Sequence, residues 1–413
     1  MGIAFASVPL VTAGCDRGAH SVAAREREAS TRSAAATSVS TTAPTAPFTR
    51  EPQEFVWTPR QVKLGPEPVR LPIDLITCMP VVTFDLADGS RQRMIIDTGA
   101  DSVIMTSSLA TVGHLTTRPS DISATDATGT AHGVPIALVT SLQLGGATFE
   151  DFDAITSPQL FAGVDALLGY PLWRDVLLTI DYSNRVIIIG RGALPPPDGK
   201  TVLPLRFDDR NRLTLPVTIN GRETWLNLDT GWGVGGILEL TAAHAAQVTW
   251  ASAPKPTIAT NAASGAIAEK IGRLGGDVKV GRYRFTEPIA GTNTGLGADI
   301  LAAAGIANFT LTLDLRNMRV RLDRADADPI RSGPVYVSGF DCDLRGAPMR
   351  VLNVLPDSGA DRAGLRAGDL LLKIDGRPAR DGLFAHNGGD FVVELSRDGL
   401  PMKLAFPMTT LVP

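Results

Sequence analysis

The sequence predicts a mainly β protein built from two similar lobes followed by a smaller α+β domain. The 413 residues include 41 Gly and 29 Pro, and few stretches show a long helical periodicity, which favours many short strands joined by turns. The middle of the chain repeats itself at an offset of about 130 residues, whereas residues 332–413 do not repeat again. A hydrophobic content of 44% and a charged content of 20% supply ample core for several domains.

Charge and histidine placement argue against two classes of site. The formal net charge of −4 leaves no basic footprint for nucleic acid. The histidines His114, His132, His244 and His386 are scattered, with no HExxH or other ligand spacing. We therefore expect no nucleic-acid partner, no metal and no cofactor.

Residues 1–15 differ from the globular part of the chain. The stretch before Cys15 carries no charge and ends in small residues, which resembles a secretory signal of the bacterial lipoprotein type, in which the Cys is lipidated. Two features depart from that pattern: Thr12 stands where such signals usually have Leu, and no basic residue precedes the apolar stretch. A membrane-spanning helix is a weaker alternative because the stretch is short, and a frayed N-terminus with an incidental Cys is another. The resemblance implies an exported protein, periplasmic or in the cell envelope, anchored to a membrane through Cys15.

Residues 16–66 are predicted to form a flexible tether. The run "ASTRSAAATSVSTTAPTAP" lies within this segment. Such a composition cannot bury enough apolar surface to offset the entropy of the chain. A tether behind a lipidated Cys would hold a globular module off the membrane.

The repeat is clearest in two predicted hairpins. "FDLADGSRQRMIIDTG" matches "VTINGRETWLNLDTG", with Asp88-Gly89 and Asn220-Gly221 as turns that need positive φ. Each Gly lies eight residues before the Asp of its Asp-Thr-Gly (97 − 89 = 8; 229 − 221 = 8). Further on, "VLLTIDYSNRVIII" matches "FTLTLDLRNMRVRL" at nearly the same offset. The sequence therefore predicts two homologous lobes, at residues 67–195 and 196–326.

Each lobe contributes one aspartate, Asp97 or Asp229, after an apolar strand. Two carboxyl groups within hydrogen-bonding distance cannot both ionise, so one pKa rises and the pair shares a proton. The pair then offers a base that activates water and an acid that protonates a leaving amine. Gly99 and Gly231 allow sharp turns that bring backbone N–H groups near the carboxylates.

From these motifs the chain resembles the pepsin and retropepsin superfamily of aspartic proteases, in the bacterial form with tandem retropepsin-like lobes, over roughly Val69 to Leu322. The resemblance implies two β-barrel lobes in a pepsin-like bilobal unit. It also implies the following site residues: catalytic Asp97 and Asp229, interlocking Thr98 and Thr230, and the supporting glycines Gly99, Gly231 and Gly169, the last in "ALLGY".

Lobe two departs from the family pattern. Trp232 stands where the family usually has Ala or Ser, and counting back from Asp314 places Ala302 where a second supporting Gly is expected, unless that Gly is displaced to Gly297. Two alternatives to a two-aspartate enzyme therefore stay open. In the first alternative, the protein is a catalytically degenerate scaffold that binds peptides. In the second, lobe one alone is active as a homodimer.

Each lobe of such enzymes also carries a β-hairpin flap that closes over the substrate. The candidates are Thr125–Val139, with Gly129 and Gly133 around the tip, and Thr260–Ile271, with Gly265. Two ordinary surface hairpins are the alternative.

Residues 332–413 resemble a PDZ domain of the type found beside exported bacterial proteases. "AGLRAGD" followed by "IDG" carries the resemblance, and Gly339 and Phe340 in "VSGF" are the candidate loop for a peptide C-terminus. The sequence as a whole indicates an aspartic endopeptidase that acts on peptide or protein substrates, with a PDZ module that recruits substrate or partner peptides.

Overall fold

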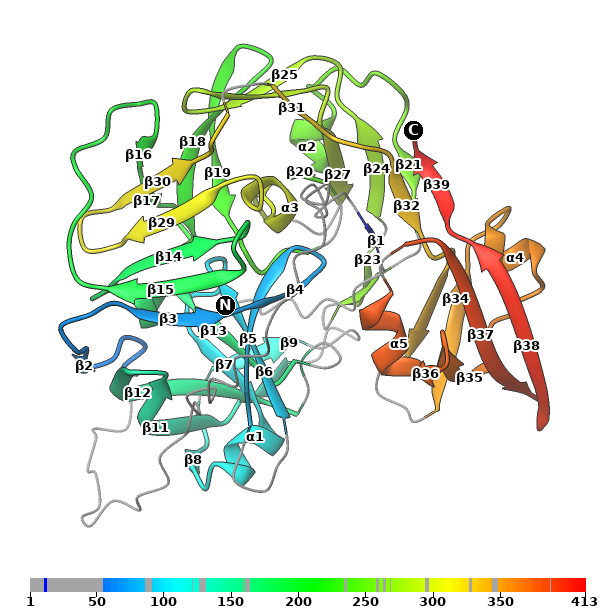
Figure 1. Cartoon of the computed structure of the whole chain (residues 1–413), viewed down its shortest axis with the longest axis horizontal. Coiled ribbons are helices and arrows are strands. Elements are labelled where there is room, and N and C mark those ends of the chain that lie inside the picture. Colours follow the sequence, from blue (N-terminus) through cyan, green and yellow to red (C-terminus); the bar gives the residue numbers. More distant parts are fainter. Residues whose placement is uncertain are drawn as a thin grey trace, which may run out of the picture.

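The computed structural model describes residues 11–12, 55–85, 91–120, 122–125, 131–158, 160, 164–233, 236–257, 260–262, 265–267, 269–293, 297–326, 329–343, 348–386 and 388–413. Figure 1 shows two β-lobes that share a sheet, and a smaller domain beside them. The mainly β class predicted from the sequence is confirmed.

Lobe one is a sheet with mixed strand directions. Its strands lie in the order β4-β5-β6-β13-β7-β12-β11-β8, with β2 beside β12 and a separate hairpin, β9–β10. The short helix α1 begins after Thr106, whose side chain accepts the Leu109 N–H. The elements are β2 (Gln61–Lys63), β4 (Asp74–Ile76), β5 (Met79–Asp85), β6 (Arg91–Asp97), β7 (Val103–Thr106), α1 (Ser107–Val112), β8 (Thr116–Arg118), β9 (Ser123–Thr125), β10 (Ala131–Gly133), β11 (Ile136–Leu144), β12 (Ala147–Ser157), β13 (Ala166–Gly169) and the 3-10 helix η1 (Tyr170–Trp173).

Lobe two repeats this plan. Its strands lie in the order β21-β24-β27-β20-β28-β19-β18-β25-β26-β31, with β17 beside β18 and a separate hairpin, β22–β23. Asn220 and Gly221, at φ of 49° and 82°, join β18 to β19 as the sequence predicts. The elements are β17 (Arg206–Phe207), β18 (Leu213–Ile219), β19 (Arg222–Leu228), β20 (Leu238–Thr241), α2 (Ala242–Ala245), β21 (Lys255–Pro256), β22 (Thr260–Ala262), β23 (Gly265–Ile267), β24 (Glu269–Arg273), β25 (Asp277–Val280), β26 (Tyr283–Thr286), β27 (Ile289–Asn293), β28 (Ile300–Leu301), α3 (Ala303–Ile306) and β31 (Ile330–Arg331).

A sheet with strands from both lobes joins them. Its order is β16-β30-β29-β14-β15-β3, and β14 pairs antiparallel with β29. Thr179 lies opposite Thr312 at the middle of this pair, with the two hydroxyl oxygens 3.0 Å apart. The pseudo-twofold axis that relates the lobes therefore passes between these threonines. The strands are β3 (Val69–Pro72), β14 (Leu177–Asp181), β15 (Val186–Gly190), β16 (Val202–Pro204), β29 (Thr310–Asp314) and β30 (Arg319–Asp323).

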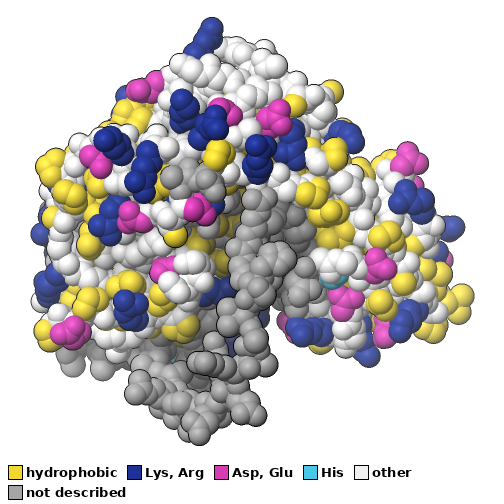
Figure 2. Space-filling model, turned by 45° about the horizontal axis from the view of Figure 1, so that its top comes forward, with side chains coloured by type: hydrophobic (Ala, Val, Ile, Leu, Met, Phe, Trp, Pro, Cys, Tyr) yellow, Lys and Arg dark blue, Asp and Glu magenta, His cyan; other side chains and the backbone are white. Residues whose placement is uncertain are grey.

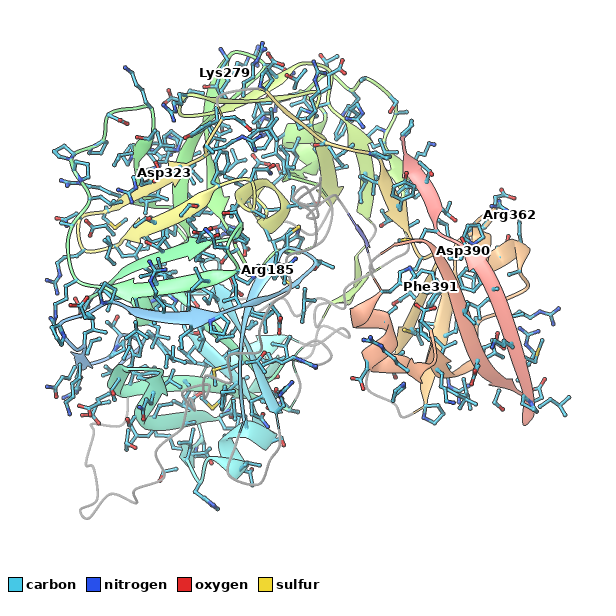
Figure 3. The ribbon with its side chains drawn as sticks, in the orientation of Figure 1. Arg185, Lys279, Asp323, Arg362, Asp390 and Phe391 are labelled. Atoms are coloured by element: carbon cyan, nitrogen blue, oxygen red, sulfur yellow. The ribbon has the colours of Figure 1, made fainter. Side chains whose placement is uncertain are left out.

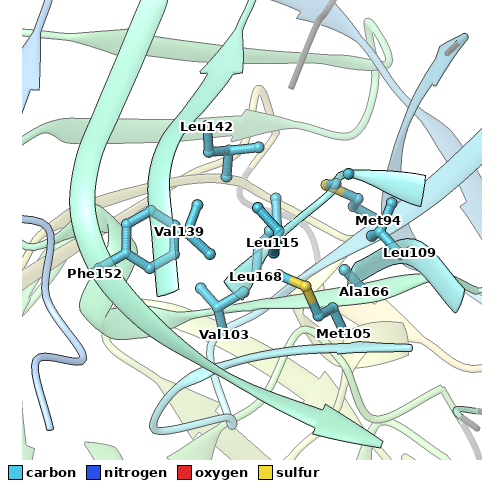
Figure 4. A pocket seen from close by; sticks show the side chains of 11 residues that line it. Met94, Val103, Met105, Leu109, Leu115, Val139, Leu142, Phe152, Ala166 and Leu168 are labelled. Carbon is cyan, nitrogen blue, oxygen red and sulfur yellow. The ribbon is translucent and has the colours of Figure 1, made fainter. Parts of the chain in front are cut away.

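The two lobes share one continuous hydrophobic core, which runs from Leu71 to Ile330. Within lobe one the core encloses a cavity with about 20 Å³ of open volume, shown in Figure 4. Its walls are apolar, and such cavities stay dry because water finds no polar partner in them. The lining residues are Met94, Val103, Met105, Leu109, Gly113, Leu115, Val139, Leu142, Phe152, Ala166 and Leu168.

The smaller domain has a core of its own, in which Phe340, Phe391 and Phe406 pack edge to face or stacked. Phe391 is labelled there in Figure 3. The sheet order is β33-β34-β35-β37-β38, with β36 beside β35, so β33 is an edge strand among the described residues. The predicted helix from about Gly359 is present as α4. The elements are β33 (Phe340–Asp343), β34 (Met349–Val354), α4 (Gly359–Arg362), β35 (Leu370–Ile374), β36 (Arg377–Pro378), α5 (Ala379–Ala385), β37 (Asp390–Arg397) and β38 (Leu400–Pro407).

The junction between lobe two and the smaller domain consists of three short strands, β1 (Val11–Thr12), β32 (Val335–Val337) and β39 (Thr409–Val412), in the order β1-β32-β39. Side chains of β32 and β39 pack on Ile271 and Ile289 of lobe two in a separate buried cluster. Arg273 reinforces this contact by donating to Gly333 O at 3.5 Å and Pro413 O at 2.6 Å. The smaller domain is therefore docked on lobe two, and β32 and β39 pair with each other, not with the sheet of that domain.

Two domain limits differ from the prediction. Residues 55–66, assigned to the tether, lie on lobe one: β2 pairs with β12, and the Val56 N–H donates to the buried carboxylate of Asp153 at 2.8 Å. Lobe two extends past residue 326, because Ile330–Arg331 pair with β26. In the part of the chain that is described, no helix has the length and apolar character needed to cross a membrane.

Candidate active site

Asp97 and Asp229 end corresponding strands of the two lobes. Asp97 is the last residue of β6, and Gly169 of β13 is its parallel neighbour. Asp229 follows β19, and its N–H donates to Leu301 O of β28 at 3.1 Å. The two carboxyl groups are hydrogen-bonded to each other, and each residue is 9% exposed. The structure therefore brings together the two aspartates that the repeat predicts.

Thr98 and Thr230 tie the two aspartate loops to each other. Each hydroxyl donates to a carbonyl of the other lobe at 2.6 Å, Thr98 to Leu228 and Thr230 to Ile96. Each hydroxyl also accepts the N–H of the other threonine, at 3.0 and 3.1 Å. Both threonines are fully buried, so water does not compete for these bonds. This reciprocal set fixes the separation of the two loops.

Gly99 and Gly231 each lie against the carboxyl group of the opposite lobe. A Cβ built on Gly99 would overlap the carboxyl of Asp229, and one built on Gly231 would overlap that of Asp97. The glycine N–H groups also donate to the aspartate of their own loop, Gly99 to Asp97 and Gly231 to Asp229, both at 2.9 Å. The sequence predicts the turn and the N–H donors, but not the reason that a side chain is excluded.

Burial raises the pKa of both aspartates of the pair. Burial raises the pKa of Asp97, although the N–H groups of Gly99 and Ala100 oppose this shift. Burial raises the pKa of Asp229 well above its ordinary value, and the charge of Asp97 raises it further. Two carboxylates this close repel in a desolvated site, so the geometry favours one proton shared by the pair.

Gly169 supports the first aspartate loop, and Ala302 takes its place in lobe two. A Cβ on Gly169 would overlap the backbone oxygen of Ser102. Ala302 follows β28 directly, is fully buried, and donates its N–H to Ile237 O at 3.0 Å. Gly297 lies before β28 and is exposed, so the displaced glycine is not the support. Lobe two accepts a methyl group at a position where lobe one has none.

Trp232 keeps the main-chain contacts of its counterpart, Ala100. Ala100 O accepts the Tyr170 N–H at 3.0 Å, and Trp232 O accepts the Ala303 N–H at the same distance. The backbone N–H of Trp232 also hydrogen-bonds to Asp229, as that of Ala100 does to Asp97 at 3.1 Å. The bulky side chain therefore does not disturb the symmetry of the two loops.

Both flap candidates are hairpins in the structure. In lobe one, Gly133 pairs with Ser123 in β9–β10, so it lies at the base of the hairpin and not around the tip as predicted. Gly129 lies outside the described residues. In lobe two, Gly265 pairs with Ala262 next to the turn of β22–β23.

The predicted peptide-binding loop lies at the start of β33. Gly339 adopts φ +81°, and a Cβ there would overlap the side chain of Ser358, the N-cap of α4. Its carbonyl accepts the Leu355 N–H at 2.8 Å, and the Phe340 ring is buried in the core beneath it.

The lipidation candidate Cys15 lies outside the described residues. Among the residues that are described, no three or more His, Cys, Asp or Glu side chains are arranged to hold a metal ion.

Sequence reasoning missed the residues that flank the aspartate pair. Asp101 and Gly233 lie four residues after the two aspartates (101 − 97 = 4; 233 − 229 = 4). Asp101 is partly exposed, and burial raises its pKa. Tyr170, which follows Gly169, donates its hydroxyl to Asn211 O of lobe two at 3.0 Å. The difference between Asp101 and Gly233 is visible in the sequence when the two lobes are aligned four residues beyond each aspartate.

Two segments of the chain match known protein families. Residues 82–172 match a family model described as Aspartyl protease, and residues 350–383 match one described as PDZ domain. Among solved structures, the chain is similar to a retropepsin-like aspartic protease from Rickettsia conorii, with 15% identity over 30% of this chain and 87% of that chain and a TM-score of 0.23. It is also similar to the HtrA3 PDZ domain bound to a phage-derived ligand, with 20% identity and a TM-score of 0.14. That match covers 15% of this chain and 64%, less than two thirds, of the other. No curated protein matches the chain. The family matches therefore give an aspartyl protease-like segment in lobe one and a PDZ-like segment in the smaller domain.

Proposed function

We propose that the protein is an aspartic endopeptidase that hydrolyses peptide bonds with water activated by Asp97 and Asp229. The observation that carries the proposal is the buried, hydrogen-bonded carboxyl pair, held by threonines that interlock across the lobes. Such a pair shares one proton, and this is the state that acid–base hydrolysis requires.

The two aspartates divide the base and acid roles, and we assign these roles as follows. The Asp97 carboxylate takes a proton from water as the water oxygen attacks the peptide carbonyl carbon, and Asp229 gives its proton to the carbonyl oxygen. As the tetrahedral intermediate collapses, the C–N bond breaks, Asp97 gives its proton to the leaving amine, and Asp229 takes a proton back from a hydroxyl of the intermediate. The Gly99, Ala100 and Gly231 N–H groups hold the two carboxyls in position.

Parallel substitutions Asp97→Asn and Asp229→Asn test the proposal. Each removes one carboxyl of the pair but keeps its shape, so we expect peptide cleavage and autolysis to fall by at least about 1,000-fold in both variants. Asp323→Asn, in β30, is the matched control because the Asp323 side chain is 46% exposed and forms a surface ion pair with Arg321. Unchanged cleavage in both dyad variants would rule out the mechanism.

The same assays separate the two alternatives. A degenerate scaffold would cleave no peptide at any pH, yet would still bind peptide C-termini through the PDZ domain. A lobe-one homodimer would depend on Asp97 but not on Asp229, and sedimentation would show it as a dimer.

The PDZ domain supports peptide binding, and we propose that it recruits substrate or partner peptides. A peptide that adds to the edge strand β33 would form main-chain hydrogen bonds, with its C-terminus at the loop around Gly339 and Phe340. Measuring the affinity of C-terminal peptides before and after amidation of the carboxyl group tests this role, because amidation should abolish binding.

We also propose that the protein is exported and tethered to a membrane through Cys15. The support is the sequence before Cys15 and the Ala/Ser/Thr/Pro-rich segment after it. Membrane fractionation of the full chain and of Cys15→Ser tests this, because the variant should leave the membrane fraction. The same distribution for both proteins would refute the anchor.

A further inference from the structure

The hairpin β9–β10, the flap candidate of lobe one, extends from a root formed by the residues on either side of it. β8 ends at Arg118, which pairs with Ile136 at the start of β11. Next to this pair, the Val134 N–H donates to Ile122 O at 2.9 Å, and the Ser120 hydroxyl donates to Val134 O. We call these five residues the hairpin root. Because the hairpin joins the body of lobe one there, the root sets the direction in which the hairpin extends.

Residues 55–63, which we call the strap, run along β12 toward the same root. At one end of the strap, β2 pairs with Thr148–Glu150. At the other end, the Val56 N–H donates to Asp153 Oδ2 at 2.8 Å, and Val56 O accepts the Asp153 N–H at 2.7 Å. Asp153 is fully buried and lies opposite Leu138 of β11. The beginning of the strap is therefore fixed beside the strand that leads out of the root.

Arg118 joins the strap to the hairpin root. Its guanidinium carbon lies 4.9 Å from the centre of the Phe55 ring, and its Nη2 atom lies 3.5 Å from Asp153 Oδ2. The Phe55 ring also stacks on Trp57, with 5.3 Å between the ring centres and 22° between the planes. A guanidinium over an aromatic face is attracted by the negative face of the ring. The strap and the carboxylate that anchors it therefore hold the last residue of β8 together.

The aromatic residues of the strap also pack on an apolar cluster inside lobe one. Phe55 and Trp57 contact this cluster, which includes Ile122 and Val134 of the hairpin root. It also includes Ile95 of β6, the strand that ends at the first aspartate of the pair. Packed side chains transmit a displacement because an interior at this density has little free space. The strap is thus in contact with the hairpin root through both a charged and an apolar route.

We propose that Phe55 is a positioning residue for peptide hydrolysis, which acts through Arg118 to fix the root of the hairpin β9–β10. This rests on the proposed peptidase function and on a hairpin that covers the bound substrate. When the root is loose, only a fraction of the molecules hold the hairpin in its binding position, and the apparent affinity for substrate falls by that fraction. Once the substrate is covered, the aspartate pair acts as before. The inference therefore predicts an effect on KM and not on kcat.

Phe55→Ala removes the aromatic face from Arg118, so KM for a cleaved peptide should rise about tenfold while kcat stays within about twofold of the parent value. Phe55→Tyr keeps the aromatic face and should restore the parent KM. Val62→Ala is the matched control, because Val62 is a partly buried residue of the same strap at the far end of β12 from the root. This control should lower the free energy of unfolding without changing KM.

A double variant tests the route through Arg118. Arg118→Gln should also raise KM, and adding Phe55→Ala to it should raise KM by less than about twofold more, because both changes remove the same contact. A KM in Phe55→Ala equal to that of the Val62→Ala control would overturn the inference while leaving the peptidase function intact. Independent effects of Phe55→Ala and Arg118→Gln in the double variant would overturn it too.

If the parent cleaves no peptide, the proposed function fails, and the hairpin root is then tested by hydrogen exchange. The probe is the Val134 N–H, which donates to Ile122 O within the root. Phe55→Ala should lower its protection at least about tenfold, and Val62→Ala should leave it unchanged. Equal protection in these two variants would overturn the positioning role as well.

Discussion

Gly99 and Gly231 face the carboxyl groups of the opposite lobe, and this contact makes both positions intolerant of any side chain. We expect Gly231→Ala to displace Asp97, because the added methyl would overlap a carboxyl that cannot swing away on its short side chain. Activity should fall by about 100-fold, and the free energy of unfolding by about 1–3 kcal/mol. The measurements are kcat/KM and urea unfolding.

Gly65→Ala is the matched control for this change. Gly65 is exposed, and a Cβ there meets nothing within 4 Å. Gly65→Ala should leave both kcat/KM and the free energy of unfolding unchanged. A Gly231→Ala protein as active as this control would mean that the glycine is not required by the facing carboxyl.

The shared proton also predicts how stability depends on pH. The ordinary carboxyl pKa is 3.8, and burial together with the Asp97 charge raises that of Asp229 well above it. Between these two values the folded protein binds more protons than the unfolded chain, so the free energy of unfolding falls as pH rises. The slope from one such group is at most about 1.4 kcal/mol per pH unit.

Asp229→Asn should remove the part of this slope that Asp229 contributes. The variant should be more stable than the parent at neutral pH but not in strong acid, where Asp229 is protonated in both the folded and the unfolded chain. Urea unfolding across the acid-to-neutral range measures this. Parallel pH curves for the two proteins would show that Asp229 does not carry the raised pKa.

At the scale of elements, Gly169 and Ala302 occupy corresponding places but differ in the space around them. Gly169→Ala should cost about 2–3 kcal/mol, because its Cβ would overlap the backbone oxygens of Ser102 and Ala100. Ala302→Gly should cost only about 1–2 kcal/mol, through a lost buried methyl and a freer unfolded chain. Urea midpoints at unchanged m-value compare the two, and equal costs would contradict the difference in packing.

Local chemistry made some elements predictable from the sequence and left others hidden. The turn at Asn220 and Gly221 and the pairing of aspartates follow from residue type and spacing. The packing of residues 55–66 on lobe one depends on a hydrogen bond from the Val56 N–H to Asp153, which lies 97 residues away in the sequence (153 − 56 = 97). Composition alone cannot reveal such a contact. The supporting role of Ala302 was hidden for a related reason, since a family pattern records the usual residue and not the space around it.

At the scale of the whole molecule, Arg273 joins lobe two to the PDZ domain. It donates to Ser332 O and Gly333 O before β32 and to Pro413 O after β39. Hydrogen bonds from a charged donor contribute about 1.5–3 kcal/mol each. Arg273→Ala should therefore lower the hydrogen-exchange protection of β32 and β39 by at least about tenfold.

Lys279→Ala is the control for this loss. Lys279 lies at the top edge of lobe two in Figure 3, away from the PDZ domain on the right. If hydrogen-exchange protection of β32 and β39 is equal in the two variants, the apolar cluster around Ile271 and Ile289 holds the junction without Arg273. Figure 2 shows basic and acidic side chains interspersed over the visible face of the molecule, so the charge removed by either variant leaves no large field of one sign.

The sheet shared by the lobes has a consequence for biosynthesis. It contains β3, which begins at Val69, and β30, which ends at Asp323. While a ribosome is still producing lobe two, β14 has no partner on the side that β29 later covers, and an unpaired strand edge invites pairing with other chains. The nascent protein therefore passes through an aggregation-prone interval that ends only when residues 310–314 have emerged and β29 has closed the edge.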